Sequence, residues 1–292
     1  MTENSERELA TGVAVFMLAP LPQLADYLTG GELVANDATI VELGAVGVAE
    51  VAPEVTFTRS ERAEAESLLD AAPGFRFNLS LAEIDALHAA KTANPAAAKA
   101  APADIAEDAY RRLLQRRAQA YLRGGLSAIT PYARTRDGGV TDPTPELRLA
   151  AADVQRLPAP GPELRDALLR YPAAPSLATT SRVFWLKRHV QRRPDFCLLH
   201  ELVMASSSLV LHVERYFYVG HSYNAGQILT GALPYQDGTV VFSTGRMSTD
   251  EVLGIGNQVN RTIGRAQLRD EMRRRLDRLR GSQLRPPSLQ NP

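Results

Sequence analysis

Apolar and polar positions alternate most densely between residues 196 and 243. Two runs rich in β-branched and aromatic residues, 196–204 and 209–219, flank a serine-rich turn and predict a β-hairpin. A third run, 227–233, extends the sheet. An Asp-Gly turn then leads into a short strand over 239–243. This part of the chain therefore predicts an antiparallel sheet.

A long helix is predicted directly after this sheet. Ser248 and Glu251 have the spacing of a capping box, and apolar residues recur at near-helical intervals from Val252 to Leu279. Gly281, followed by two prolines, predicts the end of the helix. Three glycines inside it indicate close packing on the sheet (Gly254, Gly256 and Gly264).

The first half of the chain has a different pattern. It predicts a strand at 11–18, a short helix and a second strand at 38–48. A largely helical section follows from about 58 to 176 and forms an insertion before the sheet. The next segment, 177–191, contains the only tryptophan and fits either a strand or a helix.

Together these patterns predict an α+β fold, with an antiparallel sheet packed against a long C-terminal helix. We expect one domain over residues 11–281, flanked by disordered tails at 1–10 and 282–292. Cys197 is the only cysteine, which excludes an intrachain disulfide and a cluster of thiolate metal ligands.

Charge and hydropathy narrow the class of protein. The 292 residues carry no net charge, which argues against general nucleic-acid binding. No run reaches the roughly 18 apolar residues of a membrane span, and residues 1–9 are polar and unlike a signal peptide. We expect a periplasmic or secreted protein if the sequence begins after a removed signal peptide, and a cytoplasmic one otherwise.

The predicted C-terminal helix is rich in arginine. Between Arg246 and Arg285 there are ten arginines and five acidic residues. A solvated helix face is the ordinary interpretation of such a pattern. The alternative is an anionic partner that binds at Arg265, Arg269 and Arg273.

Three histidines, His200, His212 and His221, fall on consecutive strand-like segments with Glu201 and Glu214 nearby. Histidines and carboxylates can hold zinc with one open position. Strand alternation argues against convergence of all three histidines, although His200 and His212 are placed symmetrically about the turn. We predict no metal and no cofactor, and keep a His200/His212 site as an alternative.

The densest polar motif next to an apolar strand is residues 220–224. His221 has the chemistry of a general base near neutral pH, and Tyr223 that of a hydrogen-bond donor to a substrate oxygen. These two are the candidate catalytic residues. A polar turn, or a set of hydrogen bonds lining a cavity, explains the same motif.

Aromatic residues concentrate in the second half of the chain. They form either ordinary core or the wall of a ligand cavity, since such cavities are mostly apolar with a few polar groups. The candidate ligand-binding residues are Trp185, His200, His212, Tyr216, Tyr218, His221, Tyr223 and Phe242.

Three local motifs support a comparison with known families: residues 120–125, residues 184–187 ahead of His200, and residues 218–223 before a closing helix with two Gly-Arg pairs. Together they resemble a family of uncharacterised bacterial proteins that are usually exported. The resemblance spans residues 12–280. It implies export and supplies no activity.

The order of the elements is also similar to the helix-grip architecture of START-like lipid-binding proteins, apart from the long helical middle section. This likeness implies a binding or carrier protein for a hydrophobic small molecule or lipid, which is the leading hypothesis. The alternatives are an enzyme that uses a His/Tyr or His-metal site on the C-terminal sheet, and an interaction protein that uses the arginine-rich helix.

Overall fold

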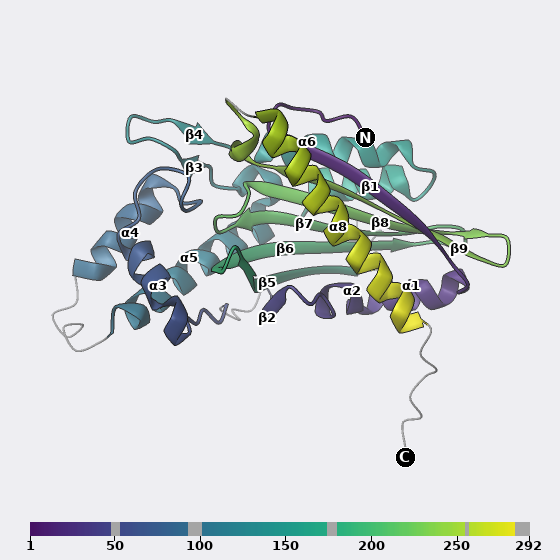
Figure 1. Cartoon of the computed structure of the whole chain (residues 1–292), viewed down its shortest axis with the longest axis horizontal. Helices are drawn as coiled ribbons and strands as arrows, with labels where there is room; N and C mark the ends of the chain where they lie inside the picture. The colour runs from purple at the N-terminus through teal and green to yellow at the C-terminus, as the bar shows by residue number, and fades with distance from the viewer. Residues whose placement is uncertain (48–52, 93–100, 174–179, 255–256, 284–292) are drawn as a thin grey trace, which may run out of the picture.

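The computed structural model describes residues 1–47, 53–92, 101–173, 180–254 and 257–283. Its centre is one antiparallel sheet of seven strands in the order β1-β9-β8-β7-β6-β5-β2 (Figure 1). The strands β5 to β9 follow one another through hairpins, and the first strand of the chain pairs with the last. The predicted α+β class with an antiparallel sheet is confirmed.

The strands lie close to the segments that alternation predicts, and the ambiguous segment 177–191 contains a strand. Their bounds are β1 Glu8–Met17, β2 Ile40–Val46, β3 Tyr132–Ala133, β4 Val140–Thr141, β5 Thr180–Val190, β6 Arg193–Ala205, β7 Val210–Val219, β8 Ala225–Tyr235 and β9 Gly238–Ser248. Strands β3 and β4 form a separate small ribbon.

The helices fall mainly between β2 and β5, as predicted. Their bounds are α1 Leu21–Gly30, α2 Glu32–Ala35, α3 Arg62–Leu69, α4 Leu81–Thr92, α5 Pro102–Gly124, α6 Thr144–Ala152, α7 Gly161–Arg170 and α8 Asn257–Gln283, with 3-10 turns η1 Arg59–Glu61, η3 Gly125–Ala128, η4 Asp153–Arg156 and η5 Asp250–Val252. Among the described helices, none combines the length and the apolar character that crossing a bilayer requires.

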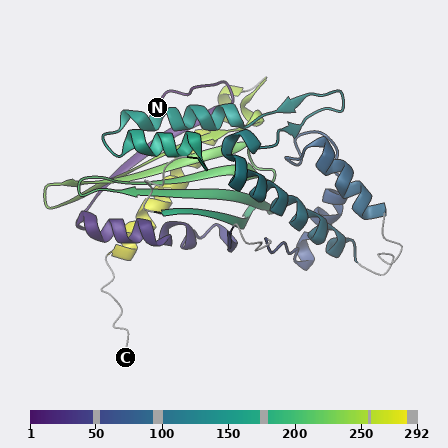
Figure 2. The same cartoon turned by 180° about the vertical axis from the view of Figure 1, so that it is seen from behind.

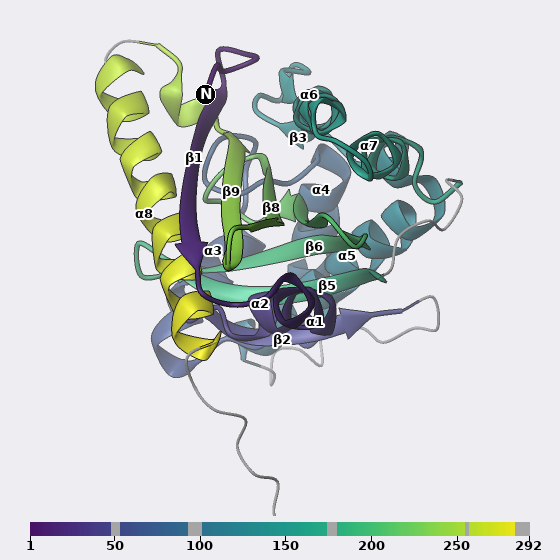
Figure 3. The ribbon, with the colours of Figure 1, turned by 90° about the vertical axis from the view of Figure 1, so that its right-hand side faces the viewer.

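Helices cover both faces of the sheet. Figure 2 shows helices of the middle section across one face, and Figure 3 shows α8 on the opposite side of β1 and β9 from α6 and α7. On β7, Val213 packs toward α6 and α7, whereas Tyr216 packs toward α8. A bulge opposite Leu198 and Leu199 turns both Phe217 and Tyr218 toward α5. Central strands are therefore buried on both faces.

The predicted start of the last helix is wrong. Ser248 is the final residue of β9, where it pairs with Glu8 of β1, so the backbone stays extended there. Thr249 instead caps the short turn η5 by accepting a hydrogen bond from the Glu251 N–H at 3.2 Å. Gly254 follows with a φ of +80°, in the left-handed region that favours glycine, and it turns the chain before α8.

The structure tests two of the three predicted helix glycines. Gly264 lies inside α8 as predicted, Gly254 precedes the helix, and Gly256 lies outside the described residues. A Cβ at Gly264 would stand 2.6 Å from Leu9 Cδ1, so this glycine does permit the close approach to β1.

The buried face of α8 also differs from the predicted stripe in its first half. Val259 and Ile263 are 62% and 50% exposed, whereas Arg261 is buried. Arg261 donates to Glu3 at 2.6 Å and to the Glu8 carbonyl at 3.2 Å, because this half of α8 lies over the N-terminal segment. In the second half, Met272, Leu276 and Leu279 are buried as predicted.

The predicted tails differ from the structure at their inner ends. The first strand starts at Glu8, three residues before its predicted start at Thr11, because β9 continues to Ser248 and pairs with it. At the other end, α8 continues to Gln283, two residues beyond the predicted stop at Gly281. Residues 284–292 lie outside the described residues.

Charged side chains fill part of the space between α8 and the sheet. Arg275 pairs with Glu214, and lies 3.5 Å from Asp37. On the same face, His212 lies 2.8 Å from Glu201, which also accepts from Arg182 at 2.6 Å. The apolar residues Leu268, Met272 and Leu276 pack beside this network. The second half of α8 thus contacts the sheet through packed side chains.

Replacing Arg275 tests this network. In Arg275→Met the Glu214 carboxylate, whose side chain is 1% exposed, loses its cation. We expect the free energy of unfolding to fall by about 3–5 kcal/mol, because an unpaired buried charge is costly. Adding Glu214→Gln should recover at least half of this loss in urea denaturation.

The exposed neighbour Arg274 is the matched control, since Arg274→Met should change stability by no more than about 0.5 kcal/mol. A loss of less than about 1 kcal/mol in Arg275→Met would show that the buried pair does not hold α8 on the sheet.

Candidate functional site

An open cleft lies beside the loop that joins β7 to β8, residues 220–224. Two pockets of about 370 and 290 Å³ meet there and share His221, Ser222 and Tyr223. The first half of α8, the η5 turn and the tip of the β5–β6 hairpin form the other walls. The motif that stands out in the sequence therefore lines a cavity.

The helical insertion holds this loop in place. The Asn78 side chain donates to the Val219 carbonyl at 2.9 Å and to the Tyr223 carbonyl at 2.8 Å. The Tyr132 hydroxyl donates to the Asn224 carbonyl at 2.9 Å. Both residues come from segments more than ninety positions away, and their side chains are buried. The loop is thus fixed by tertiary contacts as well as by its own turn.

Asp195 is the anionic centre of the site. Its buried carboxylate accepts from the His221 backbone N–H at 3.0 Å and from the Ser222 hydroxyl. It also pairs with Arg188 at 3.3 Å. One carboxylate therefore joins the β5–β6 hairpin to the β7–β8 loop.

Arg188 is a buried cation at the floor of the cleft. Its guanidinium lies 5.0 Å from the centre of the Tyr223 ring and 5.5 Å from that of Tyr216. Burial acts to lower the pKa of Arg188, but the acidic groups around it, including Asp195, raise this pKa above its usual value. The side chain consequently stays charged.

Several buried polar atoms at the cleft have no hydrogen-bond partner within the described part of the chain. These atoms are Arg188 Nε, His221 Nε2, Tyr223 Oη and Asn224 Nδ2. An unpaired buried polar group costs about 1–3 kcal/mol, so such groups are rare and concentrate where water or a ligand supplies a partner. Their grouping marks the cleft as the candidate functional site.

The protonation states of the loop residues follow from their burial. Burial lowers the pKa of His221, with Asp195 opposing this effect, so the ring is neutral at pH 7. Burial raises the pKa of the Tyr223 hydroxyl, which remains protonated. The site thus offers hydrogen-bond donors and a neutral imidazole.

The other predicted ligand-binding residues do not converge on this cleft. Only Tyr216 approaches it, with its ring 6.2 Å from that of Tyr223. Tyr218 faces α5, where its hydroxyl lies 2.8 Å from that of Tyr110, and Trp185 lies in the same core. Phe242 lines a separate pocket near α6. A single cavity wall made of all eight residues is therefore wrong.

His200 and His212 lie on opposite faces of the sheet. His212 pairs with Val203 in the register of β6 and β7, so the two side chains share a face. Val203 is three positions after His200 on β6, and residues an odd number of positions apart on a strand point to opposite faces. His200 contacts the Tyr121 hydroxyl at 2.9 Å, whereas His212 contacts Glu201. The alternative of a shared metal site is therefore wrong. No group of three His, Cys, Asp or Glu side chains in the described ranges could hold a metal ion.

Sequence reasoning missed Arg188 and Asp195, which lie deepest in the site. Arg188 falls in the segment 177–191, which fits either a strand or a helix, so the sequence does not predict the direction of its side chain. Asp195 lies at the start of β6. The only available signal was a charged residue within an apolar strand pattern.

The arginines proposed to bind an anionic partner have different surroundings. Arg265 donates to Glu3 of the N-terminal segment at 2.7 and 2.8 Å. Arg269 and Arg273 are exposed. An anionic partner at these three residues stays a prediction, and it would have to compete with Glu3 for Arg265.

The buried His200 makes a prediction about pH. Burial, with Arg215 nearby, lowers the pKa of His200 to about 3. In the unfolded chain the histidine pKa is near 6.5. Below this pH the unfolded state binds a proton that the folded state excludes, so the free energy of unfolding falls as the pH decreases from 6.5 toward 3.

Between pH 6.5 and pH 5 the free energy of unfolding of the wild type should fall by about 1.6 kcal/mol from this residue, and His200→Gln should not show this loss. Urea denaturation at a series of pH values measures the difference. The two slopes should coincide above pH 7.5, and equal slopes below pH 6.5 would contradict the assignment of a neutral His200.

Comparisons with protein-family models, with curated proteins and with solved structures find no match to this chain.

Proposed function

We propose that this chain is a non-catalytic binding protein for a small amphipathic molecule, held in the cleft between the β7–β8 loop and the first half of α8. The observation that carries the proposal is the group of four buried polar atoms beside this cleft that have no partner among the residues the structure describes. Ligand sites typically combine a mostly apolar wall with a few placed polar groups, in volumes of about 300 Å³ and more.

Two sides of the cleft differ in character. Leu9, Val190, Ile263 and Leu268 provide an apolar side, and Ile263 is half exposed there. The opposite side carries Arg188, His221 and Tyr223, whose free atoms are mainly hydrogen-bond donors. This contrast favours a ligand with an apolar body and an oxygen acceptor at one end.

The charges around the cleft favour an uncharged head group. Asp195 already neutralises Arg188, and Glu251 and Glu271 also line the cleft. A carboxylate would meet these acidic side chains, whereas a carbonyl or hydroxyl oxygen can accept from the same donors without repulsion. We therefore propose ketones, esters or alcohols with an apolar tail as the ligand class.

The helix-grip likeness is part of this proposal. In support of it, α8 packs along β1 and β9 on one face of the antiparallel sheet. The second half of α8 lies on packed side chains such as Met272 and Leu276, so the proposed ligand occupies an open cleft under the first half.

A second candidate function is an enzyme with His221 as general base. The neutral ring and its unpartnered Nε2 atom favour it. The two functions differ in outcome: a bound ligand is recovered unchanged from a carrier, whereas an enzyme converts it, and His221→Gln would abolish the conversion.

The test uses medium-chain methyl ketones and their matched carboxylates as probes in isothermal titration calorimetry. We expect the ketones to bind, and the carboxylates to bind at least about tenfold more weakly. At a hundred times the dissociation constant, a bound ketone should stabilise the protein by about 2.7 kcal/mol. Native mass spectrometry of gently purified protein should reveal a retained natural ligand.

A matched pair of variants locates the site. Gln267 is exposed and lines the cleft, so Gln267→Trp should weaken ketone binding by at least about 1.4 kcal/mol, or tenfold. Arg269 is exposed two residues further along α8 and does not line the cleft, so Arg269→Trp should bind as the wild type does. Equal binding by both variants would overturn the proposal.

A further inference from the structure

A second cavity lies on the other face of the sheet. It has a volume of about 440 Å³ and is bounded by β8 and β9 on one side and by α6 and η4 on the other. Leu229 and Phe242 provide its floor, and Val154 and Leu157 line its wall. Phe242, a predicted ligand-binding residue, thus lines a cavity that is separate from the cleft.

A glycine shapes the floor of this cavity. Gly231 lies opposite Phe242 in the register of β8 and β9. A Cβ at position 231 would stand 2.2 Å from the tip of the Phe242 ring, so the ring lies across the strand where a side chain is missing. The half-buried ring consequently forms a flat apolar surface.

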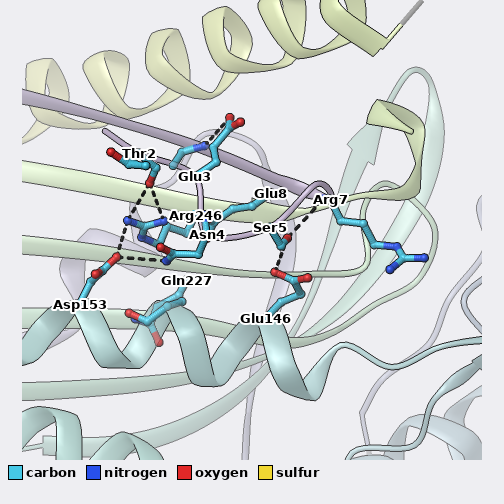
Figure 4. Close-up of polar contacts among 12 residues, drawn as sticks. Thr2, Glu3, Asn4, Ser5, Arg7, Glu8, Glu146, Asp153, Gln227 and Arg246 are labelled. Atoms are coloured by element: carbon cyan, nitrogen blue, oxygen red, sulfur yellow. Dashed lines mark hydrogen bonds and ion pairs between the residues drawn. The ribbon is translucent and has the colours of Figure 1, made fainter. Parts of the chain in front are cut away.

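The N-terminal segment, residues 1–7, forms the roof, and we call it the strap. Met1, Thr2 and Asn4 line the cavity. Figure 4 shows how the strap is held: Asn4 donates to Asp153 at 3.3 Å, and the Ser5 hydroxyl donates to Glu146 at 2.8 Å. The strap therefore bridges from the sheet edge to α6 and η4.

The strap is also tied to the opposite layer. Glu3 pairs with Arg261 and Arg265 of α8 at 2.6 and 2.7 Å, and Arg7 pairs with Asp250 at 2.8 Å. The Arg7 and Arg265 side chains are 44% and 43% exposed, so their pairs are individually weak, whereas the Arg261–Glu3 pair is mostly buried. Lifting the strap therefore breaks one mostly buried pair and leaves the strand pairing of the sheet beneath it intact.

The rim carries two arginines that share Asp153. Arg156 also lines the cavity; it lies 3.7 Å from Asp153, and its side chain is 81% exposed. Arg246 pairs with Glu8 at 2.6 Å and with Asp153, and donates to the Thr2 carbonyl at 3.3 Å (Figure 4). The Gln227 amide is also occupied, accepting from Arg215 at 2.9 Å and donating to the Ala150 carbonyl at 3.1 Å. A charged ligand would find no unpaired counter-charge on these rim residues.

From these observations we infer a second binding site, for a small, uncharged, mainly apolar molecule that lies on Phe242 beneath the strap. The floor and wall are apolar, and the charged side chains at the rim pair with one another. Such a site disfavours ions and favours a ligand that is mainly aromatic or aliphatic. This site lies across the sheet from the cleft, and it does not depend on the function proposed for the cleft.

The test uses N-phenyl-1-naphthylamine, an uncharged dye whose fluorescence rises in apolar surroundings. The wild type should bind it with a dissociation constant in the micromolar range. Thr244 is half-buried and lines the cavity, so Thr244→Trp should fill the space and weaken binding at least tenfold. Leu157→Trp, which fills the cavity from the wall, should have the same effect.

Two controls separate this site from other surfaces. Val240 is half-buried on the same face of β9 but outside the cavity lining, so Val240→Trp should bind the dye normally. Gln267→Trp, which fills the cleft, should also bind normally. Unchanged melting temperatures and circular dichroism in each variant establish that folding is retained.

Loosening the strap tests its role as the roof. In the double variant Asn4→Ala/Ser5→Ala, the two bonds to η4 and α6 are removed, so we expect the dye to associate at least several-fold faster in stopped-flow fluorescence.

Three results would overturn the inference: no dye binding by the wild type, undiminished binding by both Thr244→Trp and Leu157→Trp, or loss of binding in Gln267→Trp alone. An unchanged association rate in the strap variant would remove the strap from the inferred site.

Discussion

Polar side chains on strands that are buried on both faces must find partners in the covering helices, and this requirement organises the protein. Arg215 of β7 is fully buried and donates to the Leu168 carbonyl at the end of α7 at 2.6 Å. On the reverse face, Glu214 pairs with Arg275 of α8. Because adjacent residues of one strand project to opposite sides, β7 specifies the position of a helix on each face. Because an unpaired buried charge is costly, other positions of these two helices, in which the pairs are broken, are strongly disfavoured.

The candidate site is the place where unpartnered atoms gather beside a cleft; among the described residues, buried Arg275 and His212 under α8 also keep atoms without a partner. The strands end at the β7–β8 loop, and no covering helix supplies partners for Arg188 Nε or His221 Nε2 among the described residues. The site is nevertheless rigidly framed, since Asp195 and Asn78 hold the loop from two directions. A fixed frame with free hydrogen-bonding atoms is the arrangement that ligand binding requires, because little ordering remains to be done on association. On the other side of the sheet, the strap lies over a cavity whose rim residues Arg246 and Gln227 are already paired.

Much of the fold could be predicted because its signals are local. The alternation over β6 and β7 and the turns that bound them depend on neighbouring residues only. The last helix shows the limit of such signals: the capping pattern at Ser248 is present, but pairing of β9 with β1 keeps this residue in a strand. Likewise Val259 and Ile263 follow the helical period yet lie exposed, since the N-terminal segment places Arg261 on the buried side. Contacts between the two ends of the chain decide both cases.

The sequence by itself determined the α+β class, the antiparallel strands, the helical insertion and the polar motif at His221 and Tyr223, because periodicity and composition act over a few residues. Only the tertiary structure decided which side chains meet. Register placed His200 and His212 on opposite faces, and it brought Arg188 and Asp195 under a loop about thirty residues further along. Strand alternation relates residues within one strand, whereas a site is assembled across several, and the register that relates them depends on the packing of the whole sheet.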